Sequence, residues 1–250
     1  MVVQIIGRKE VETNPNRVYV EKPDGIYSFP KHIDHFQTKA KIKPENYALV
    51  QEGDQEDYAI SMMWGFNSFQ FIPTNVKVLQ SGLFVPTPSI FMPHYKNVND
   101  TLQGKSVLYD AAGNLIEGKR LNDYANVINH NCWVVLNARF PKGKGFLGLD
   151  LVTITGLDKK GRPILKREHL EDCLEEDCFA ELESTNSQGF LTKKAKVQEY
   201  EPGKTVYFVY PRLDSVARFV ADSDRASLSY SWDPRDSYAG LGVFPCAVGA

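Results

Sequence analysis

Short apolar runs bounded by turn residues dominate the first hundred residues and predict β-strands there. A Pro-Asp-Gly turn at 23–25 separates two of the runs and predicts a hairpin. A longer apolar and aromatic run over 58–72 is predicted to be buried, and the prolines after it are expected to interrupt regular structure. The shorter runs are 3–6, 17–21, 25–29 and 47–51, and the prolines are Pro86, Pro88 and Pro93. We therefore expect residues 1–100 to be a β-rich N-terminal part, either a subdomain or an extension of one body.

Helical spacing of apolar residues occurs twice in the second half of the chain. A helix is predicted over 119–130, where the apolar residues recur at intervals of three, three and one: Leu121, Tyr124, Val127 and Ile128. The acidic run 167–183 places Leu170, Leu174 and Phe179 inward, which predicts a second amphipathic helix. Strands are predicted at 132–140, 149–156 and 207–210, and the closing strands of the fold lie within 205–246. The pattern predicts a single α+β body over 1–250, β-rich with two helices.

Composition and charge argue against several classes of protein. The chain has 250 residues with a net charge of −2 and no basic stripe, so nucleic acid is not an expected partner. The N-terminus MVVQIIGRKE becomes charged too early for a signal peptide, and no apolar run is long enough to span a membrane. We expect a soluble protein without membrane insertion. Its location stays open between cell surface, virion and cytoplasm.

The cysteines predict neither a disulfide scaffold nor a metal site. Four of them in 250 residues are too few for a scaffold. Cys132 and Cys246 stand in apolar surroundings and are expected to be buried thiols. The run from His169 to Cys178 reads His-x3-Cys-x4-Cys, which matches no zinc pattern. We expect no metal and no cofactor.

Enzyme motifs are absent from the sequence. No Gly-x-Ser-x-Gly, His-Glu-x2-His or Gly-x-Gly-x2-Gly run occurs, and the Pro-Lys-Gly-Lys-Gly turn at 141–145 lacks the ending of a phosphate-binding loop. The protein is therefore not expected to be an enzyme. Two alternatives stay open. One is a hydrolase or transferase that uses His169 or His130 with the acidic stretch 171–183, and the other is a structural protein of a viral or similar particle.

The last part of the chain differs in composition from the rest. After Lys204 there is no Lys, Glu, Gln, Met, Asn, His or Ile, and all charges in 212–246 come from Asp and Arg. Short, stiff or planar side chains lose little rotamer entropy on binding, and recognition surfaces favour such a set. The bias predicts a ligand-binding region over 212–246. A terminal β-hairpin of ordinary composition is the alternative interpretation.

Two kinds of position alternate in this region. Bulky or apolar positions are expected to be scaffold, and small, polar or aromatic positions are expected to be exposed on one rim. The scaffold positions are Arg218, Phe219, Leu228, Trp232, Leu241 and Gly242. The ligand-binding positions are Asp222, Asp224, Arg225, Ser227, Ser229, Tyr230, Ser231, Asp233, Asp236 and Tyr238. We expect the anchors of binding to be Tyr230, Trp232, Tyr238 and Arg225, while Asp and Ser supply adaptable hydrogen bonds.

The genetic code relates the members of the second set. An Asn codon ending in C or T, changed only at its adenines, can give Asp, Ser, Tyr, Arg, Val, Leu, Gly or Ala. It cannot give Lys, Glu, Gln, Met or Trp, so Trp232 would be scaffold. The pattern resembles the variable region of proteins diversified by diversity-generating retroelements. It is most similar to the archaeal, Nanoarchaeota-type branch of that family.

This resemblance implies a fold and a function. The fold would be C-type lectin-like, with a constant body that displays a variable strand-and-loop segment. Adenine-directed mutagenic reverse transcription would change that segment, so the protein would be a variable receptor for a protein or glycan on another cell or virus. Bacterial members carry Gly-Gly-Ser-Trp-like and Gly-Phe-Arg runs, whereas this chain has Tyr-Ser-Trp at 230–232 and Leu-Gly-Val at 241–243.

Overall fold

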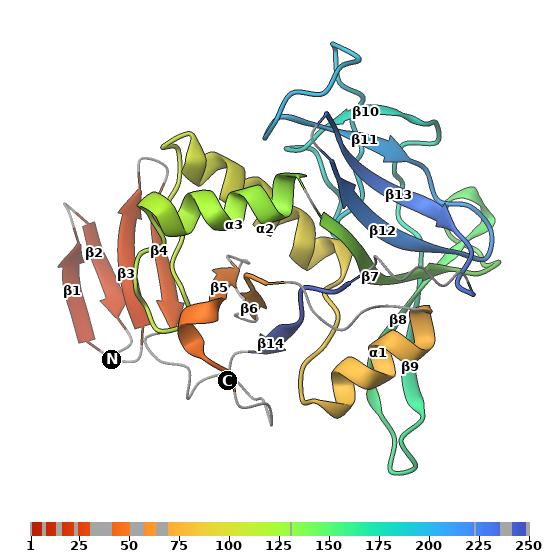
Figure 1. The fold of residues 1–250 in the computed structure, drawn as a ribbon, viewed down its shortest axis with the longest axis horizontal. Coiled ribbons are helices and arrows are strands. Elements are labelled where there is room, and N and C mark those ends of the chain that lie inside the picture. Colours follow the sequence, from red (N-terminus) through yellow and green to blue (C-terminus); the bar gives the residue numbers. More distant parts are fainter. Residues whose placement is uncertain are drawn as a thin grey trace.

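The computed structural model describes the backbone of four N-terminal strands and of a core from residue 42 onward. Within that core the described residues are 42–50, 58–63, 70–130, 132–222, 224–235 and 242–248. They form a mixed α+β, β-rich fold, as predicted, with three α-helices where two were expected (Figure 1). None of the described helices is long and apolar enough to cross a membrane.

Two of the three described helices were not predicted, because residues 1–100 were expected to be β-rich and interrupted by prolines. They are α1 (Phe71–Gln80) and α2 (Pro88–Leu102), and α3 (Gly118–His130) confirms the predicted helix. Pro73 and Pro88 fall in the first turns of their helices, where a backbone N–H has no partner within the helix. Pro93 lies inside α2 and removes one bond of the first turns. The prediction that prolines end regular structure here is wrong.

The prediction of an acidic helix over 167–183 is also wrong. Its first residues belong to strand β9, its last belong to strand β10, and residues 170–177 between them are irregular. Leu170 is buried at the end of β9, while Cys178 pairs with Phe208 across the sheet. Backbone pairing with neighbouring strands therefore overrides the helical spacing of the apolar residues.

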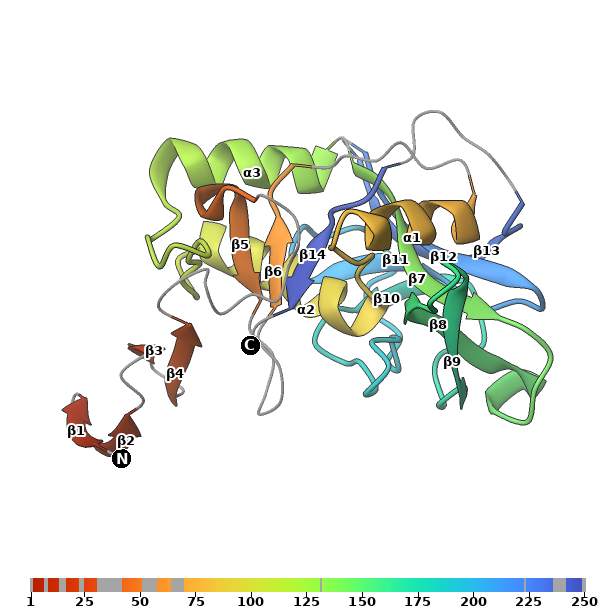
Figure 2. The same cartoon turned by 90° about the horizontal axis from the view of Figure 1, so that it is seen from below.

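The N-terminal strands form two separate hairpins, and the strand over 9–13 was not predicted. They are β1 (Val2–Ile6) with β2 (Lys9–Thr13), and β3 (Arg17–Lys22) with β4 (Gly25–Pro30). Lys22 pairs with Gly25, so the hairpin predicted at the Pro-Asp-Gly turn is confirmed. Both hairpins lie at one end of the molecule in Figures 1 and 2.

A seven-stranded sheet forms the main body, in the order β10-β11-β13-β12-β7-β8-β9. All its pairs are antiparallel except β11 with β13. The strands are β7 (Cys132–Phe140), β8 (Asp150–Leu157), β9 (Pro163–His169), β10 (Cys178–Glu181), β11 (Thr205–Val209), β12 (Ser215–Ala221) and β13 (Ala226–Trp232). Strands β7, β8 and β11 confirm predicted strands, and β12 and β13 are the expected closing strands.

A smaller sheet of order β14-β6-β5 lies beside the main body (Figure 2). Its strands are β5 (Tyr47–Val50), β6 (Tyr58–Ser61) and β14 (Cys246–Val248). Short 3-10 turns occur at Pro44–Asn46 and Phe146–Gly148. Helices α2 and α3 pack against each other and against strands of both sheets, and one large apolar core fills the space between them.

The C-terminal segment joins the two sheets. Gly242 exchanges backbone hydrogen bonds with β7, accepting from Val135 and donating to Trp133. Four residues later, Cys246 pairs with Ile60 of β6 on one side and with Phe84 on the other. Side chains in this segment are fully buried, Val243, Phe244 and Cys246 among them. Residues 242–247 are therefore part of the core.

Candidate ligand-binding site

The compositionally biased region lies in the middle of the main sheet. Strand β13 pairs with β11 on one side and β12 on the other, and β12 also pairs with β7. Phe219 and Leu228 face each other across this pair and are fully buried. The ring centroid of Phe219 lies 4.9 Å from that of Phe91 and 4.7 Å from that of Tyr95, both on α2. The scaffold positions on these strands thus hold the sheet against α2.

Tyr230, an expected binding anchor, is a core residue. Its ring packs edge-on against three phenylalanines at centroid distances of 5.1–5.5 Å, namely Phe140, Phe190 and Phe208. The hydroxyl is buried without a hydrogen-bond partner, and this burial raises the pKa of Tyr230 well above its ordinary value. A ligand cannot reach this side chain, so the expectation for Tyr230 is wrong.

The two central serines of β13 are also covered. Ser227 and Ser229 are 9% and 6% exposed, although they lie on the opposite side of the strand from Leu228. Their cross-strand neighbours on β12 are Val220 and Arg218. An inner strand covered on both faces has no solvent-facing set of side chains, so alternation does not expose these residues. The prediction that Ser227 and Ser229 face a ligand is wrong.

The remaining expected positions divide between the two ends of β13. Asp222, Asp224 and Arg225 precede the strand, whereas Ser231 and Asp233 are at its far end. Seven residues at ~3.3 Å each separate the two groups by roughly 20 Å. A single rim that carries all of them is therefore ruled out. At the first end Asp222 accepts a 3.1 Å hydrogen bond from the indole N–H of Trp133, while Asp224 and Arg225 are exposed.

At the second end the charged side chains surround a hollow of about 410 Å³. Its lining residues are Gln70, Ile72, Pro73, Arg139, Asp214, Asp233, Pro234 and Arg235. Arg139 lies 3.6 Å from Asp214, and Arg235 lies 2.7 Å from Asp233. The Nε of Arg139 is buried and has no hydrogen-bond partner. The hollow therefore combines charges of both signs.

The backbone at Asp214 has an uncommon conformation. Its φ of 56° lies in the left-handed region, which few residues other than glycine adopt. The Asp214 N–H donates to the carbonyl of Phe140 at 2.8 Å, which fixes the turn before β12. Two exposed apolar side chains accompany it, Leu213 at 59% and Ile72 at 42%. Such outliers concentrate at functional sites, and this one places a carboxylate at the mouth of the hollow.

The carboxylate of Asp233 is kept ionised by its neighbours. Arg235 donates to it from the side chain and from the backbone N–H, and Arg139 adds a nearby positive charge. These contacts lower the pKa of Asp233 to about 2. The carboxylate thus stays charged across the whole neutral and mildly acidic range.

Three further scaffold positions are described: Arg218 and Gly242 are buried as expected, and Trp232 is partly buried. The guanidinium of Arg218 is buried and lies over the ring of Trp232, which is partly buried. Gly242 is buried beside β7. Three predicted residues lie outside the described part of the chain: Asp236, Tyr238 and Leu241.

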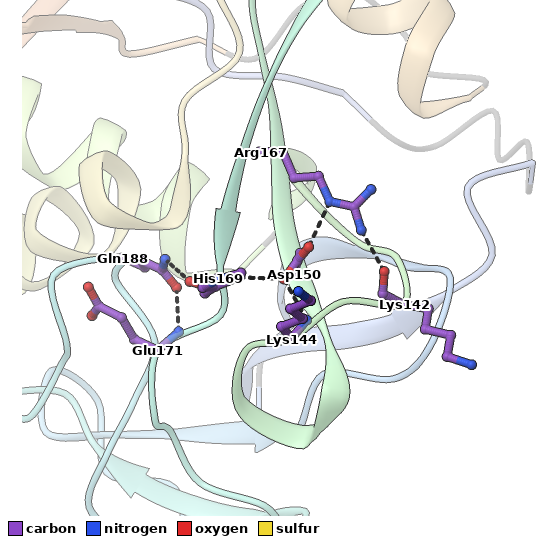
Figure 3. A network of polar contacts seen from close by, with 7 residues as sticks. All are labelled: Lys142, Lys144, Asp150, Arg167, His169, Glu171 and Gln188. Atoms are coloured by element: carbon purple, nitrogen blue, oxygen red, sulfur yellow. Dashed lines mark hydrogen bonds and ion pairs between the residues drawn. The ribbon is translucent and has the colours of Figure 1, made fainter.

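A second polar cluster is centred on Asp150 at the start of β8 (Figure 3). Its carboxylate accepts from Arg167 Nε at 2.7 Å and from the Lys144 N–H at 3.0 Å, and it lies 2.9 Å from His169 Nδ1. The His169 contact, then those of Arg167 and Lys144, lower the pKa of Asp150 well below its ordinary value. A Cβ added at Gly143 would overlap this carboxylate, so the Pro-Lys-Gly-Lys-Gly turn wraps around it.

A second hollow, larger than the one at the end of β13, lies on the other face of the β8–β9 hairpin from His169. This groove has a volume of about 930 Å³. Leu151, Thr153, Lys166 and Glu168 face it, which by strand alternation turns Asp150, Arg167 and His169 away. His130 is exposed at the end of α3. The residues of the enzyme alternative are therefore not gathered in one cavity.

The four described cysteines form no disulfide, and Cys132 and Cys246 are buried as predicted. Burial raises the pKa of Cys173 to about 12. Among the described residues no group of three or more His, Cys, Asp or Glu side chains could hold a metal ion.

Sequence reasoning missed three charged residues of the hollow, Arg139, Asp214 and Arg235. The sequence signal for Arg139 is a charged residue in an otherwise apolar strand. The signal for Asp214 is its place among the aspartates of the biased region. Comparison of the chain with protein-family models, with curated proteins and with solved structures finds no match.

Proposed function

We propose that the protein is a ligand-binding receptor whose recognition surface is the hollow at the end of β12 and β13. The observation that carries this proposal is that three exposed charges of the biased region, Asp214, Asp233 and Arg235, line one hollow together with Arg139. Their side chains are 64%, 40% and 85% exposed. Binding there is recognition without a catalytic step.

The chemistry of the hollow favours a polar partner. Arg139 contributes a positive charge, and the two carboxylates accept hydrogen bonds. The exposed apolar residue Ile72 lines the hollow and adds apolar contact area. A protein or glycan on another cell or virus presents such a mixture of hydroxyl, amide and apolar groups.

We further propose that the segment is changed by adenine-directed mutagenic reverse transcription on a C-type lectin-like scaffold. The support is the residue set of 212–246, which excludes Lys, Glu, Gln and Met. Burial limits where changes are tolerated, because Phe219, Leu228 and Tyr230 hold the core. Ser231, Asp233 and Arg235 can change without loss of core packing.

The binding surface is tested with two display libraries built on the whole chain. One randomises Asp214, Ser231, Asp233 and Arg235, and the matched control randomises Asp224 and Arg225 with two exposed helix positions, Lys119 and Asp123. Selection against a panel of proteins and glycans should yield specific binders from the first library only. Equal yields from both libraries would refute the site.

Diversification is tested separately by sequencing the codons for 205–250 from the source population, with a search of the flanking DNA for a template repeat. Substitutions confined to codons whose template partner carries adenines would support it. A uniform segment without a nearby template repeat would refute diversification and leave the binding surface to its own test.

One observation supports a hydrolase or transferase as a second candidate. Asp150 holds Nδ1 of His169, the arrangement that orients a histidine as a general base. The carboxylate is also used by Arg167 and the Lys144 N–H, which fits a structural role of the cluster equally well. Hydrolytic activity that disappears in His169→Ala while the melting temperature is unchanged would establish the enzyme.

A further inference from the structure

Of the four outer edges of the two core sheets, three are covered by other backbone segments of the described chain and one is open. The outer edge of β10 is covered by the segment at 193–195, that of β5 by residues 109–111, and β14 is bridged by Phe84. Strand β9 is the fourth edge, and no backbone segment of the described chain pairs with its outer side. Unpaired strand edges are sites where another extended chain can add, and folded proteins usually cover them.

Hydrogen bonds around β9 show which backbone groups face outward. The backbone N–H and C=O of Ile154 on β8 form hydrogen bonds with the side chain of Asn137. They therefore point away from Leu165, the residue that pairs with Ile154 on β9. In an antiparallel pair this makes Leu165 and Arg167 point their own backbone groups outward. The outward carbonyl of His169 is already bound by the side chain of Gln188, which confirms the alternation (Figure 3). The open stretch therefore offers two N–H and two C=O groups.

The side chains of this hairpin restrict what can pair with it. From 141 to 169 there are seven Lys or Arg residues and three Asp or Glu residues in a chain whose net charge is −2. Ile164 and Leu165 are 47% and 57% exposed on opposite faces of the strand. Two copies of β9 pairing with each other would bring Lys166 and Arg167 of both copies together, which repels. The charge and the exposed apolar residues fit an acidic partner strand with apolar side chains.

We propose that β9 is a docking edge for an extended acidic segment of another protein, which adds to the main sheet as an eighth strand. Backbone hydrogen bonds to Leu165 and Arg167 supply the register, in the mode of strand addition. The basic side chains of the hairpin select the acidic sequence. This surface is separate from the hollow at the end of β13, so the two proposals stand independently.

The groove on one face of the hairpin adds a place for side chains. Lys166 and Glu168 of β9 line it, together with apolar residues such as Leu83 and Phe84. Alternate side chains of an added strand extend the same face and point toward this space. The hairpin itself extends from the body of the molecule, which leaves room for a partner beside it (Figure 1).

The test uses the full chain with an alternating Glu-Val peptide as probe and a Lys-Val peptide as control. Hydrogen exchange at the amides of Leu165 and Arg167, followed by NMR, should slow by about tenfold or more at saturation with the Glu peptide. The Lys peptide should leave both amides unchanged. Equal protection by both peptides, or protection on another strand, overturns the proposal.

A pair of variants separates backbone pairing from side-chain contact. Leu165→Pro removes the outward N–H of an edge strand, a position where proline is tolerated, and should abolish binding. Leu165→Ala keeps the N–H and should retain measurable binding. Unchanged binding by Leu165→Pro overturns the proposal, and so does self-association through β9 without peptide. If Leu165→Pro fails to fold, a Glu-Val peptide N-methylated at alternate residues replaces it, and its binding as tightly as the parent peptide overturns the proposal.

Discussion

The guanidinium carbon of Arg218 lies 4.1 Å from the ring centroid of Trp232, and the two residues belong to neighbouring strands of the biased region. Arg218 is buried, so its charge is removed from most of the solvent. A cation over an aromatic face gains more in such a setting than at an exposed site. This contact explains how an arginine is accommodated on an inner strand of the sheet.

The Arg218–Trp232 contact should be measurable as a coupling energy. In a double-mutant cycle with Arg218→Gln and Trp232→Leu, followed by urea unfolding, we expect a coupling of about 1–2 kcal/mol. Arg212 over Tyr210, at 5.2 Å and more exposed, is the control pair and should give about 0.5 kcal/mol. Equal couplings for the two pairs would contradict the role given to burial.

Tyr230 should behave as a core residue. Tyr230→Phe removes a buried hydroxyl without a partner, so the free energy of unfolding should stay the same or rise by about 1 kcal/mol. Tyr230→Ala should lower it by about 3–5 kcal/mol because the ring leaves a cavity among three phenylalanines. Loss of ligand binding in Tyr230→Phe, with the fold intact, would restore Tyr230 as an anchor.

Within the biased region, burial should separate structural from replaceable positions. Phe219→Ala should lower the free energy of unfolding by about 3–5 kcal/mol, since its ring packs on Phe91 and Tyr95. Asp224→Ala should change it by less than about 0.5 kcal/mol, because Asp224 is exposed. Chemical denaturation of both variants checks this, and a large loss from Asp224→Ala would show an unrecognised contact.

His94 should make the protein sensitive to mild acid. It is fully buried, its Nε2 lies 2.5 Å from the Tyr124 hydroxyl, and burial lowers its pKa from 6.5 to about 3. The unfolded chain therefore binds a proton between pH 6.5 and 3 that the folded protein does not, and stability falls as pH falls through that window. From pH 7.5 to 5 this loss amounts to about 2 kcal/mol.

The variant His94→Gln keeps a hydrogen-bonding group opposite Tyr124 and cannot take up this proton. Urea unfolding at pH 7.5 and 5 should show a smaller loss for the variant by the same amount. An identical loss in both proteins would mean that other groups cause the acid sensitivity. The comparison stays above pH 5 because carboxylates with lowered pKa, such as Asp150 and Asp233, titrate below that range.

The C-terminal segment should be required for folding. A chain that stops at 241 lacks the pairing of Gly242 with β7 and of Cys246 with β6, and also the buried ring of Phe244. We expect no cooperative thermal unfolding for this truncation. Phe244→Ala in the full chain should lose about 3–5 kcal/mol and still unfold cooperatively. A cooperative transition in the truncated chain would show that the segment is not required for folding.

Local pattern predicted much of the fold where one face of an element is buried. The spacing of Leu121, Tyr124 and Ile128 identified α3, and the apolar run from Cys132 identified β7. The pattern failed where tertiary pairing decided the outcome, as at Cys178, which pairs with Phe208 in a strand although its neighbours have helical spacing. Helix α2 was missed because Pro88 occupies a first-turn position in which proline is favourable.

The candidate site could be predicted only in part, for a related reason. Composition singled out 212–246, but alternation assumes a strand with one solvent face, and β13 has none over Ser227 and Ser229. Neither the separation of its ends by roughly 20 Å nor the approach of Arg139 from β7 is encoded in local sequence. The hollow arises from three strand ends and a helix start that meet only in the folded chain.

The position of residues 242–248 also determines which mutations in the gene leave the protein able to fold. Because this segment follows the exposed stretch near Asp233 and Arg235, any insertion or deletion there that shifts the reading frame replaces the strand joining the two sheets. The product loses its core and is open to proteolysis. In-frame substitutions at exposed positions leave that strand intact. Frameshifted copies of the protein therefore fail to fold, whereas copies with in-frame substitutions at exposed positions still fold.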